Sequence, residues 1–550
     1  MTRITGRAAF LQLLVDEGVT HLFGNPGTTE LPIMEVVPDY PQLKYVLGLQ
    51  EAVVLGMADG FCRASNRLAA ANVHVAPGLG NAIGALYNAR FSGSPVILTA
   101  GQQEQGHGLL EPMLYEPLVP IAQPLVKWAV DVTRAEDLPR ILHRAAKIAL
   151  TPPTGPVFLS LPGDVLDQSV EIDMGRPVRV DAAVRPNDET LQQLLKRLLA
   201  ARRPAILAGQ ELAMRDAFGE AAELAELLGA AVYQSSIPYS AQFPTEHPAF
   251  MGALTRSQKQ VRALLQDYDV LLCLGADLLR MSVYSPVEPL PETLPVIHIS
   301  ERSAELGKNY RTDLAVAANV KETLRALLAL LRNRPEAEAK ARLDALKSRN
   351  WSAQRESARM EALLAAETAP IDPRYLMLRF TETLPKDAVV VDEGLVSTYA
   401  LPKLLPLRDP RSYYGLASGG LGFAMPGAVG ISLALPGRPV AAIVGDGSSL
   451  YSVQALWSAA HEKLPITYII ANNRGYRIIK ERLVSMRSTD KFTGMDLRDP
   501  EIDFVALGRS FGLAARRVAD PQDIAPALRE AFASGAPNLV DVRVADGFGG

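Results

Sequence analysis

Short, continuous apolar runs recur along this chain of 550 residues and alternate with stretches of helical character. Clear examples occupy residues 155–161, 270–275, 441–444 and 466–470. A continuous apolar run of this length predicts a strand that is buried on both faces. Buried strands that alternate with helices are typical of parallel α/β sheets and not of sandwiches or helical bundles. The chain is therefore predicted to be an α/β protein with doubly wound parallel sheets.

Two segments without strand character divide the chain into three parts. Residues 174–187 are rich in Pro and Arg, and residues 333–373 are polar and helix-prone, so both are predicted to be linkers. We expect three domains, at residues 1–170, 188–335 and 370–550. With 48% hydrophobic and 21% charged residues, the chain has enough apolar side chains for three ordinary cores.

The most informative chemical motif lies in the third predicted domain. Gly445-Asp446-Gly447-Ser448 follows one apolar run, and Asn472-Asn473 follows the next. The ends of neighbouring parallel strands meet at one edge of a sheet, so we expect Asp446 and Asn473 to converge there. One carboxylate and one amide oxygen suit a Mg²⁺ ion that is shared with a bound diphosphate. Taken singly, each element would also suit an ordinary turn or loop.

The spacing of the two elements resembles the signature of thiamine diphosphate-dependent enzymes. Such enzymes need a carboxyl group on N1′ of the aminopyrimidine ring, and Glu51 is the candidate. An isolated Glu at the start of a helix would more simply be read as a favourable partner of the helix dipole. Further segments decide between these readings, and in order and spacing they resemble benzoylformate decarboxylase: residues 23–32, 77–82, 99–103, 124–128, 243–245, 419–424 and 455–457.

The resemblance covers nearly the whole chain and implies roles for single residues. Asp446, Asn473 and the carbonyl oxygen of Gly475 would bind Mg²⁺, with Ca²⁺ as an alternative metal. The diphosphate would lie against Gly445, Gly447, Ser448 and Tyr476. Leu421 would hold the cofactor in its bent conformation, and the Gly419 carbonyl would accept from its 4′-amino group.

On the substrate side, the resemblance assigns His74 as an acid or base and Thr28 as the group that binds the substrate carboxylate. An imidazole changes charge near neutral pH, which suits the first role. In the family the position of Thr28 holds a serine, so the additional methyl group narrows the pocket. A second family histidine falls near Ser282 and is missing here, which places efficient decarboxylation in doubt. His107 is one candidate to replace it.

Two further departures concern the cofactor edge. Gly394-Leu395-Val396 replaces a polar run, so backbone amides, or Ser397 and Thr398 just beyond, would have to contact the phosphates. After the metal motif, Arg477 and Lys480 lie among bulky apolar residues. A solvated helix face is the simple reading of these cations. The alternative is that one of them attracts a second anionic group on the substrate.

The expected reaction is the non-oxidative decarboxylation of a 2-keto acid, benzoylformate-like, to an aldehyde and CO₂. The alternative is an acetolactate synthase-like carboligase or a 2-hydroxyacyl lyase, which makes or cleaves a carbon–carbon bond. The sequence does not distinguish whether the decarboxylated fragment is protonated or joined to a second carbonyl. A purely non-enzymatic protein is disfavoured because Glu51, Asp446 and Asn473 are all present.

Composition limits the partners and the compartment. The formal net charge is -4, with Lys and Arg scattered among acids, so neither nucleic acid nor a membrane surface is an expected partner. The two cysteines, Cys62 and Cys273, lie in apolar surroundings and are predicted to be core residues of a cytoplasmic protein. No apolar run is long enough to span a bilayer. By resemblance to the family, the chain should form at least a homodimer and most readily a homotetramer.

Overall fold

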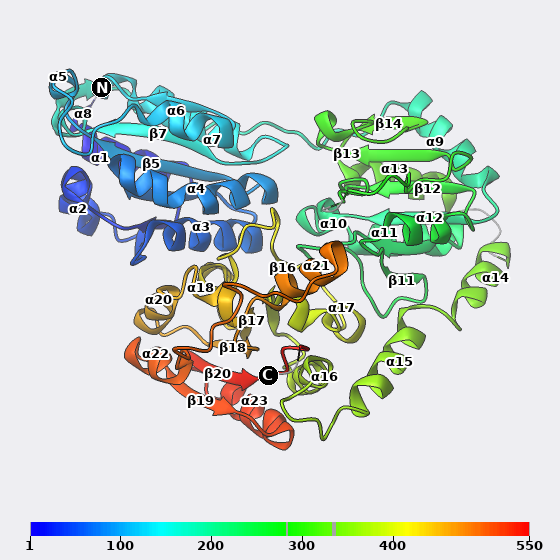
Figure 1. The fold of residues 1–550 in the computed structure, drawn as a ribbon. Coiled ribbons are helices and arrows are strands. Elements are labelled where there is room, and N and C mark those ends of the chain that lie inside the picture. The colour runs from blue at the N-terminus through cyan, green and yellow to red at the C-terminus, as the bar shows by residue number, and fades with distance from the viewer. Residues whose placement is uncertain (1, 282–283, 333–336, 549–550) are drawn as a thin grey trace.

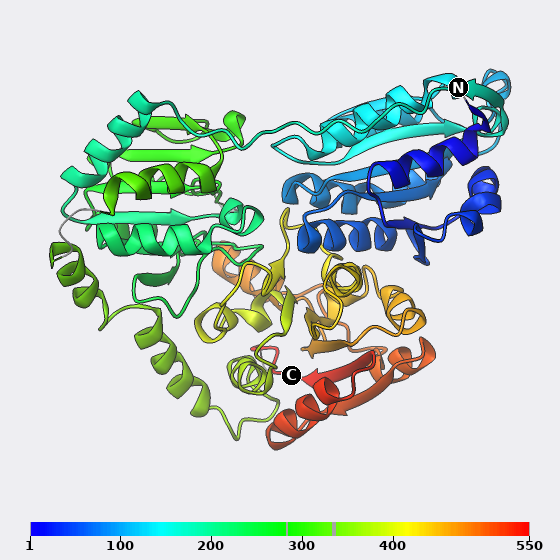
Figure 2. The ribbon, with the colours of Figure 1, turned by 180° about the vertical axis from the view of Figure 1, so that it is seen from behind.

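The computed structural model describes residues 2–281, 284–332 and 337–548. Three six-stranded sheets, each parallel throughout, follow one another along the chain, and helices cover both faces of each sheet (Figures 1 and 2). The prediction of an α/β protein with three doubly wound parallel sheets is confirmed.

The N-terminal sheet has the strand order β3-β2-β4-β5-β7-β6. Its strands are β2 (His21–Gly24), β3 (Lys44–Leu47), β4 (Ala69–His74), β5 (Val96–Gln102), β6 (Ala129–Asp131) and β7 (Val157–Pro162). Its helices are α1 (Gly6–Asp16), α2 (Leu31–Val36), α3 (Glu51–Ser65), α4 (Val75–Ser92), α5 (Gln105–Gly108), α6 (Leu118–Ala122), α7 (Leu138–Leu150) and α8 (Gly163–Asp167). The short strands β1 (Thr2–Thr5) and β8 (Ser169–Ile172) form an antiparallel pair.

The central sheet has the order β11-β10-β9-β12-β13-β14. Its strands are β9 (Pro204–Ala208), β10 (Ala231–Gln234), β11 (Phe250–Ala253), β12 (Val270–Leu274), β13 (Val296–Ser300) and β14 (Leu314–Ala317). The helices are α9 (Asp188–Ala200), α10 (Gln210–Met214), α11 (Phe218–Leu228), α12 (Gln258–Leu265) and α13 (Val320–Leu331). Between Ile172 and Asp188 the chain forms no helix or strand, and α9 begins where the Asn187 side chain accepts from Thr190 N at 2.8 Å.

The C-terminal sheet has the order β16-β15-β17-β18-β20-β19. Its strands are β15 (Val389–Glu393), β16 (Tyr413–Gly415), β17 (Val440–Gly445), β18 (Ile466–Asn472), β19 (Ala514–Val518) and β20 (Asn538–Arg543). The helices are α16 (Pro373–Thr383), α17 (Leu401–Leu404), α18 (Ala424–Ala434), α19 (Asp446–Ser449), α20 (Ala455–His461), α21 (Arg477–Arg487), α22 (Phe504–Ser510) and α23 (Ile524–Ala533). Two helices, α14 (Ala337–Leu346) and α15 (Trp351–Leu363), connect it to the central domain (Figure 1).

The N-terminal and C-terminal domains meet through a close crossing of α3 and α18. A Cβ atom added at Gly60 would lie 2.3 Å from the Gly427 carbonyl oxygen, and one added at Gly430 would lie 1.9 Å from that of Met57. Real Cβ atoms do not approach other atoms so closely, so these glycines allow the two helix backbones to touch. The contact therefore fixes how the domain that contains Glu51 sits on the C-terminal domain.

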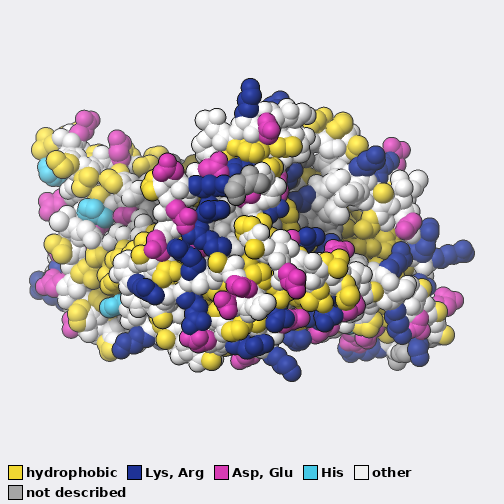
Figure 3. All heavy atoms as spheres, turned by 60° about the horizontal axis from the view of Figure 1, so that its bottom comes forward, with side chains coloured by type: hydrophobic (Ala, Val, Ile, Leu, Met, Phe, Trp, Pro, Cys, Tyr) yellow, Lys and Arg dark blue, Asp and Glu magenta, His cyan; other side chains and the backbone are white. Residues whose placement is uncertain are grey.

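The surface carries charges of both signs. On the face shown in Figure 3, Lys and Arg side chains are interspersed with Asp and Glu, as expected for a chain without a broad electrostatic patch. Within the described ranges, no helix is both long enough and apolar enough to cross a membrane.

Candidate active site

Asp446 and Asn473 converge at the carboxyl edge of the C-terminal sheet, as the sequence predicts. Asp446 follows β17 and Asn473 follows the neighbouring strand β18. The Gly475 N–H lies 3.0 Å from Asp446 Oδ2 and 3.0 Å from Asn473 Oδ1, so one donor holds both oxygens together. Gly475 itself pairs with Asp496 in an antiparallel bridge, and a Cβ atom there would lie 2.7 Å from the Met495 carbonyl oxygen.

The donor set fits a metal that is shared with phosphate groups. The described ranges hold no cluster of three or more His, Cys, Asp or Glu side chains that could bind a metal without a further ligand. Two side-chain oxygens and the Gly475 carbonyl leave the rest of an octahedral Mg²⁺ shell for phosphate oxygens and water. Burial raises the pKa of Asp446 to about 6, and a bound cation would favour its ionised form.

Small residues leave room beside this pair. A Cβ atom added at Gly445 would find no atom closer than 3.7 Å, whereas one added at Gly447 would lie 2.6 Å from the Tyr476 ring. Gly447 therefore lets Tyr476 pack across the start of α19. Ser448 is buried in the same turn. These residues form the surface on which the sequence predicts a diphosphate.

The loop that contains Leu421 is anchored by a carboxyl group that the sequence analysis missed. Glu393, at the end of β15, accepts from Gly422 N at 2.6 Å and from Ala424 N at 2.7 Å. Gly419 and Gly422 have φ angles of +84° and +103°, which favour glycine, so the half-buried Leu421 sits in a defined turn. Burial raises the pKa of Glu393 to about 7. The sequence signal for Glu393 is a glutamate at the end of an apolar strand, at the edge of the sheet where the cofactor is expected.

Glu51 is the first residue of α3. Its helix begins because the Gln50 side chain accepts from Ala52 N at 2.6 Å and from Val53 N at 3.2 Å. Glu51 is half-buried, and its Oε2 accepts from Asn81 Nδ2 at 3.0 Å. A Cβ atom at Gly78 would lie 3.2 Å from Glu51 Oε1. Both contacts come from α4, so the carboxylate is oriented by its own domain.

His74 is held by a buried carboxylate that the sequence analysis also missed. Glu30 is 0% exposed, and its Oε2 lies 2.8 Å from His74 Nδ1. Glu30 also accepts from Gly27 N, Gly101 N and Thr29 Oγ1, each at 2.9 Å. Because the carboxylate accepts, His74 carries a proton on Nδ1 and can exchange another at Nε2.

The backbone of the residue after His74 is strained. Val75 has a φ angle of +44°, a conformation that a β-branched residue rarely adopts. A Cβ atom at Gly27 would lie 2.3 Å from the His74 ring, so the loop before Glu30 packs tightly on the imidazole. Strained backbone that is held in place by its surroundings is common at functional sites. The geometry therefore supports a functional role for His74.

The other candidate residues have less support from the structure. Thr28 is exposed on the same turn as Glu30, but it is Thr29 whose hydroxyl lies 3.0 Å from His74 Nδ1. His107 is exposed on α5. Ser282 lies outside the described residues. In the C-terminal domain, Ser397 is buried, and Thr398 Oγ1 donates to the Leu395 carbonyl oxygen at 3.2 Å.

The two cations after the metal motif have internal partners, which removes the support for a substrate contact. Lys480 is 3% exposed, and its Nζ lies 2.6 Å from Asp496 Oδ1. Arg477 donates to Glu481 Oε1 at 2.8 Å and to the Ala545 carbonyl at 3.2 Å. The C-terminal segment and residues 489–498 pack on α21, so these cations are neither a solvated face nor free for substrate.

Comparisons with known proteins agree with this geometry. Three family models of the thiamine pyrophosphate enzymes match successive parts of the chain. The model of the N-terminal TPP binding domain matches residues 4–113, that of the central domain matches 191–327, and that of the C-terminal TPP binding domain matches 396–542. A benzoylformate decarboxylase of Pseudomonas aeruginosa is 35% identical over 544 residues, which cover 98% of each chain. The chain belongs to the thiamine pyrophosphate enzyme family.

Solved structures of other thiamine pyrophosphate enzymes share the fold over the full length. A thiamine diphosphate-dependent 4-hydroxybenzoylformate decarboxylase of Rhodococcus jostii has a TM-score of 0.88 and 33% identity, and covers 98% of this chain and 99% of its own. Benzoylformate decarboxylase of Polynucleobacter necessarius has a TM-score of 0.89 and 28% identity, with the same coverage.

A probable acetolactate synthase large subunit of Methanocaldococcus jannaschii is 28% identical over 98% of this chain and 91% of its own length.

In this thiamine pyrophosphate enzyme, an internal carboxyl group lies at the carboxyl edge of the central sheet. Glu211, at the start of α10, accepts from Ser300 Oγ at 2.5 Å and from Glu301 N at 2.9 Å. Burial raises the pKa of Glu211. Dinucleotides bind doubly wound sheets at this edge, with their phosphates on a helix N-terminus. Glu211 places a buried carboxyl group at this point of the edge, which disfavours a phosphate group there.

Proposed function

We propose that this enzyme catalyses the thiamine diphosphate- and Mg²⁺-dependent, non-oxidative decarboxylation of a benzoylformate-like 2-keto acid to an aldehyde and CO₂. The observation that carries the proposal is the buried Glu30, which orients His74 through Nδ1. A fixed imidazole of this kind can exchange a proton with a substrate carbonyl group through Nε2. The full-length similarity to benzoylformate decarboxylases supports the same reaction.

The C-terminal domain would hold the cofactor. Asp446, Asn473 and the Gly475 carbonyl would bind the metal, and the turn from Gly445 to Ser448 would accommodate the diphosphate, with Tyr476 alongside. The turn held by Glu393 would place Leu421 and the Gly419 carbonyl against the organic part of the cofactor. When bound, thiamine diphosphate supplies the electron sink that decarboxylation requires.

The N-terminal domain would supply the groups that move protons. Glu51 would hold a proton at the pyrimidine nitrogen N1′, with its carboxylate oriented by Asn81. His74 Nε2 would give a proton to the substrate carbonyl oxygen and take it back, while the carboxylate of Glu30 stabilises the charged imidazole. The exposed hydroxyl of Thr28 would bind the substrate carboxylate at the entrance to this turn.

We also propose that the active site forms between two copies of the chain. The C-terminal end of α3 lies against the carboxyl edge of the C-terminal sheet, because Arg63 Nη1 donates to the Gly415 carbonyl at 3.0 Å. Glu51 begins the same helix, about 18 Å further along its axis at 1.5 Å per residue. This orientation supports a homodimer, and by extension a homotetramer, in which Glu51 serves the cofactor of a partner.

A carboligase of the acetolactate synthase kind is the second candidate, because such enzymes are among the relatives. The buried free cysteines Cys62 and Cys273 fit a reducing compartment and support a cytoplasmic location.

A CO₂-release assay on protein loaded with thiamine diphosphate and Mg²⁺ tests the proposal. The substrates are aryl, branched, short and dicarboxylic 2-keto acids, and the products are identified by mass. We expect CO₂ and the matching aldehyde from an aryl acid. CO₂ with only 2-hydroxy ketone products would move the assignment to a carboligase, and no CO₂ from any acid would contradict decarboxylation.

A further inference from the structure

The turn that contains Gly419 is attached to the N-terminal domain by a network of three polar side chains. Asp59, on α3, accepts from Asn88 Nδ2 at 2.7 Å, and Asn88, on α4, accepts at Oδ1 from the Ser418 hydroxyl at 3.1 Å. The Ser418 N–H also donates to Asn88 Oδ1, at 3.1 Å. Asp59 is 1% and Asn88 3% exposed. The Asp59–Asn88–Ser418 network therefore crosses between the two domains while its N-terminal part is shielded from water.

Hydrogen-bond chemistry fixes the direction of each group in this network. An ionised carboxylate only accepts, so the Asn88 amide turns its N–H₂ group to Asp59 and its oxygen to Ser418. The Ser418 hydroxyl gives its one hydrogen to Asn88 and accepts from the Gly420 N–H at 3.1 Å. Reversing the amide would place its N–H₂ group against the Ser418 N–H, so a single arrangement is favoured.

The same network sets the direction of the Gly419 carbonyl. In a trans peptide the C=O and N–H bonds point in opposite directions, so the bond from Gly420 N–H to the Ser418 hydroxyl turns the Gly419 oxygen away from that hydroxyl. Gly419 is exposed, and a Cβ atom added there would meet no atom within 4 Å, so this residue borders open space. Because a glycine with a φ angle of +84° has no side chain to restrict it, hydrogen bonds must hold this peptide in place.

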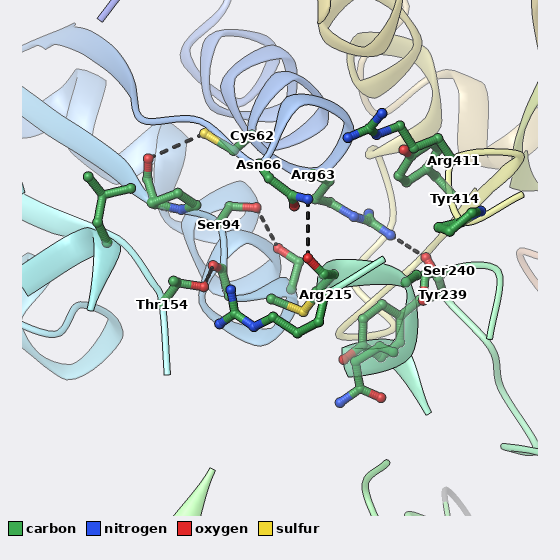
Figure 4. Close-up of a pocket in the computed structure, with 18 residues that line it drawn as sticks. Cys62, Arg63, Asn66, Ser94, Thr154, Arg215, Tyr239, Ser240, Arg411 and Tyr414 are labelled. Atoms are coloured by element: carbon green, nitrogen blue, oxygen red, sulfur yellow. Dashed lines mark hydrogen bonds between the residues drawn. The ribbon is translucent and has the colours of Figure 1, made fainter. Parts of the chain in front are cut away.

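The strand that leads into the turn is attached to the N-terminal domain in a second place. Arg63, at the C-terminal end of α3, donates to the Gly415 carbonyl oxygen at 3.0 Å, and its guanidinium group lies 5.4 Å from the centre of the Tyr414 ring. Figure 4 shows Arg63 extending from α3 towards Tyr414. Residues 415–418 are thus held on the N-terminal domain at both ends, so the position of the turn follows that domain.

We propose that Asn88 and Ser418 are positioning residues that aim the Gly419 carbonyl at the 4′-amino group of thiamine diphosphate. The inference rests on the proposed function, which places the organic part of the cofactor against Gly419. Asp59 strengthens the arrangement, because its charge-assisted bond fixes the Asn88 amide more firmly than a neutral partner would. The N-terminal domain thereby orients the cofactor through the turn of the C-terminal domain, independently of Glu51.

Ser418→Ala tests this role in the full chain loaded with thiamine diphosphate and Mg²⁺. It removes the acceptor of the Gly420 N–H but leaves the backbone bond to Asn88. We expect the affinity for thiamine diphosphate, measured by fluorescence titration, to fall about three- to tenfold, the range of one neutral hydrogen bond. The circular dichroism of the bound aminopyrimidine ring should change and kcat should fall, whereas KM for the 2-keto acid should not change. Ser418→Thr keeps the hydroxyl and should restore the affinity, the spectrum and kcat.

Ser92→Ala is the matched control. Ser92 Oγ also donates to Asp59, at 2.7 Å, but its hydrogen bonds stay within the N-terminal domain. The control should therefore keep the cofactor affinity and the spectrum of the unaltered enzyme, even if its unfolding temperature falls. Because Asn88 and Ser418 act along one path, Asn88→Ala combined with Ser418→Ala should lower the affinity by less than the product of the two single effects.

Three results would overturn the inference alone while the unaltered enzyme binds its cofactor. They are a Ser418→Ala enzyme with unchanged affinity and spectrum, a Ser92→Ala enzyme with the same losses as Ser418→Ala, and a double variant whose losses multiply in full. An unaltered chain that does not bind thiamine diphosphate would overturn the proposed function as well, so the two failures are distinguishable.

Discussion

Replacing Glu30 by Gln would test whether His74 depends on a carboxylate. In the structure, four donors converge on the two oxygens of Glu30: Gly27 N, Gly101 N, Thr29 Oγ1 and His74 Nδ1, at 2.8 to 2.9 Å. A glutamine has one acceptor oxygen and one N–H₂ group. Whichever way the amide turns, at least one buried N–H loses its acceptor. That loss should cost about 1–3 kcal/mol of stability.

The effect on catalysis follows from the lost charge. A hydrogen bond to a charged group contributes about 1.5–3 kcal/mol and one between neutral groups about 0.5–1.5 kcal/mol, so the imidazolium should lose about 1–1.5 kcal/mol of stabilisation. Since each 1.36 kcal/mol is tenfold in rate, we expect kcat to fall about tenfold. KM should change less, because the substrate carboxylate is assigned to Thr28.

The assay is steady-state decarboxylation of the best 2-keto acid, with thermal unfolding measured in parallel. Glu35→Gln is the control, because Glu35 lies on the neighbouring helix, is 66% exposed and pairs with Arg7 at 3.3 Å. A surface pair of this kind contributes at most about 1 kcal/mol, so the control should keep its kcat. A folded Glu30→Gln enzyme with unchanged kcat would refute the role given to Glu30.

Four further outcomes are expected. Glu51→Gln should nearly abolish turnover while cofactor binding, followed by fluorescence titration, is retained; turnover near that of the unaltered enzyme would contradict the proton-holding role. Asp446→Ala should lose Mg²⁺-dependent binding of thiamine diphosphate in the same titration, and unchanged affinity would remove the metal assignment. The pKa of Glu393 is raised from 4.5 to about 7, so its contribution to stability is full below pH 4.5 and is lost as the pH rises through 7. The rise in pKa from 4.5 to about 7 corresponds to about 3 kcal/mol. Between pH 4.5 and 7, the free energy of unfolding of the cofactor-free protein should therefore fall by up to that amount, and Glu393→Gln should remove the fall. An identical pH dependence in the variant would count against this role of Glu393. Gly430→Ala should destabilise the protein by about 3 kcal/mol through its 1.9 Å clash with the Met57 carbonyl, whereas Gly84→Ala, which meets no atom within 4 Å, should be neutral or stabilising in thermal unfolding.

Local patterns carried the fold prediction well. The apolar runs at residues 441–444 and 466–470 correspond to β17 and β18, because a strand buried on both faces needs an apolar residue at every position. The same reasoning brought Asp446 and Asn473 together, since both follow neighbouring parallel strands. Glu51 was correctly expected at the start of a helix. In each case the signal lies within a few residues of the feature.

Features that depend on distant contacts were not predictable in this way. Glu30 acquires its role from His74, 44 residues later, and Glu393 from the turn that contains Gly422, 29 residues later. Lys480 looked accessible because it lies on a charged helix, but it is buried by the segment that contains Asp496. Such pairings arise from tertiary packing, and a charged residue in sequence gives no indication of the partner that neutralises it.

The crossing of α3 and α18 also bears on how the chain reaches its native state. The last residue of α3 and the first of α18 are separated by 359 positions, from Ser65 to Ala424. At a synthesis rate of about 5–20 residues per second, the apolar face of α3 emerges from the ribosome about 20–70 s before its partner exists. During that interval α3 exposes small residues that pack on α18 in the folded chain, such as Gly56 and Gly60. Newly made N-terminal domain should therefore be the species most in need of a chaperone.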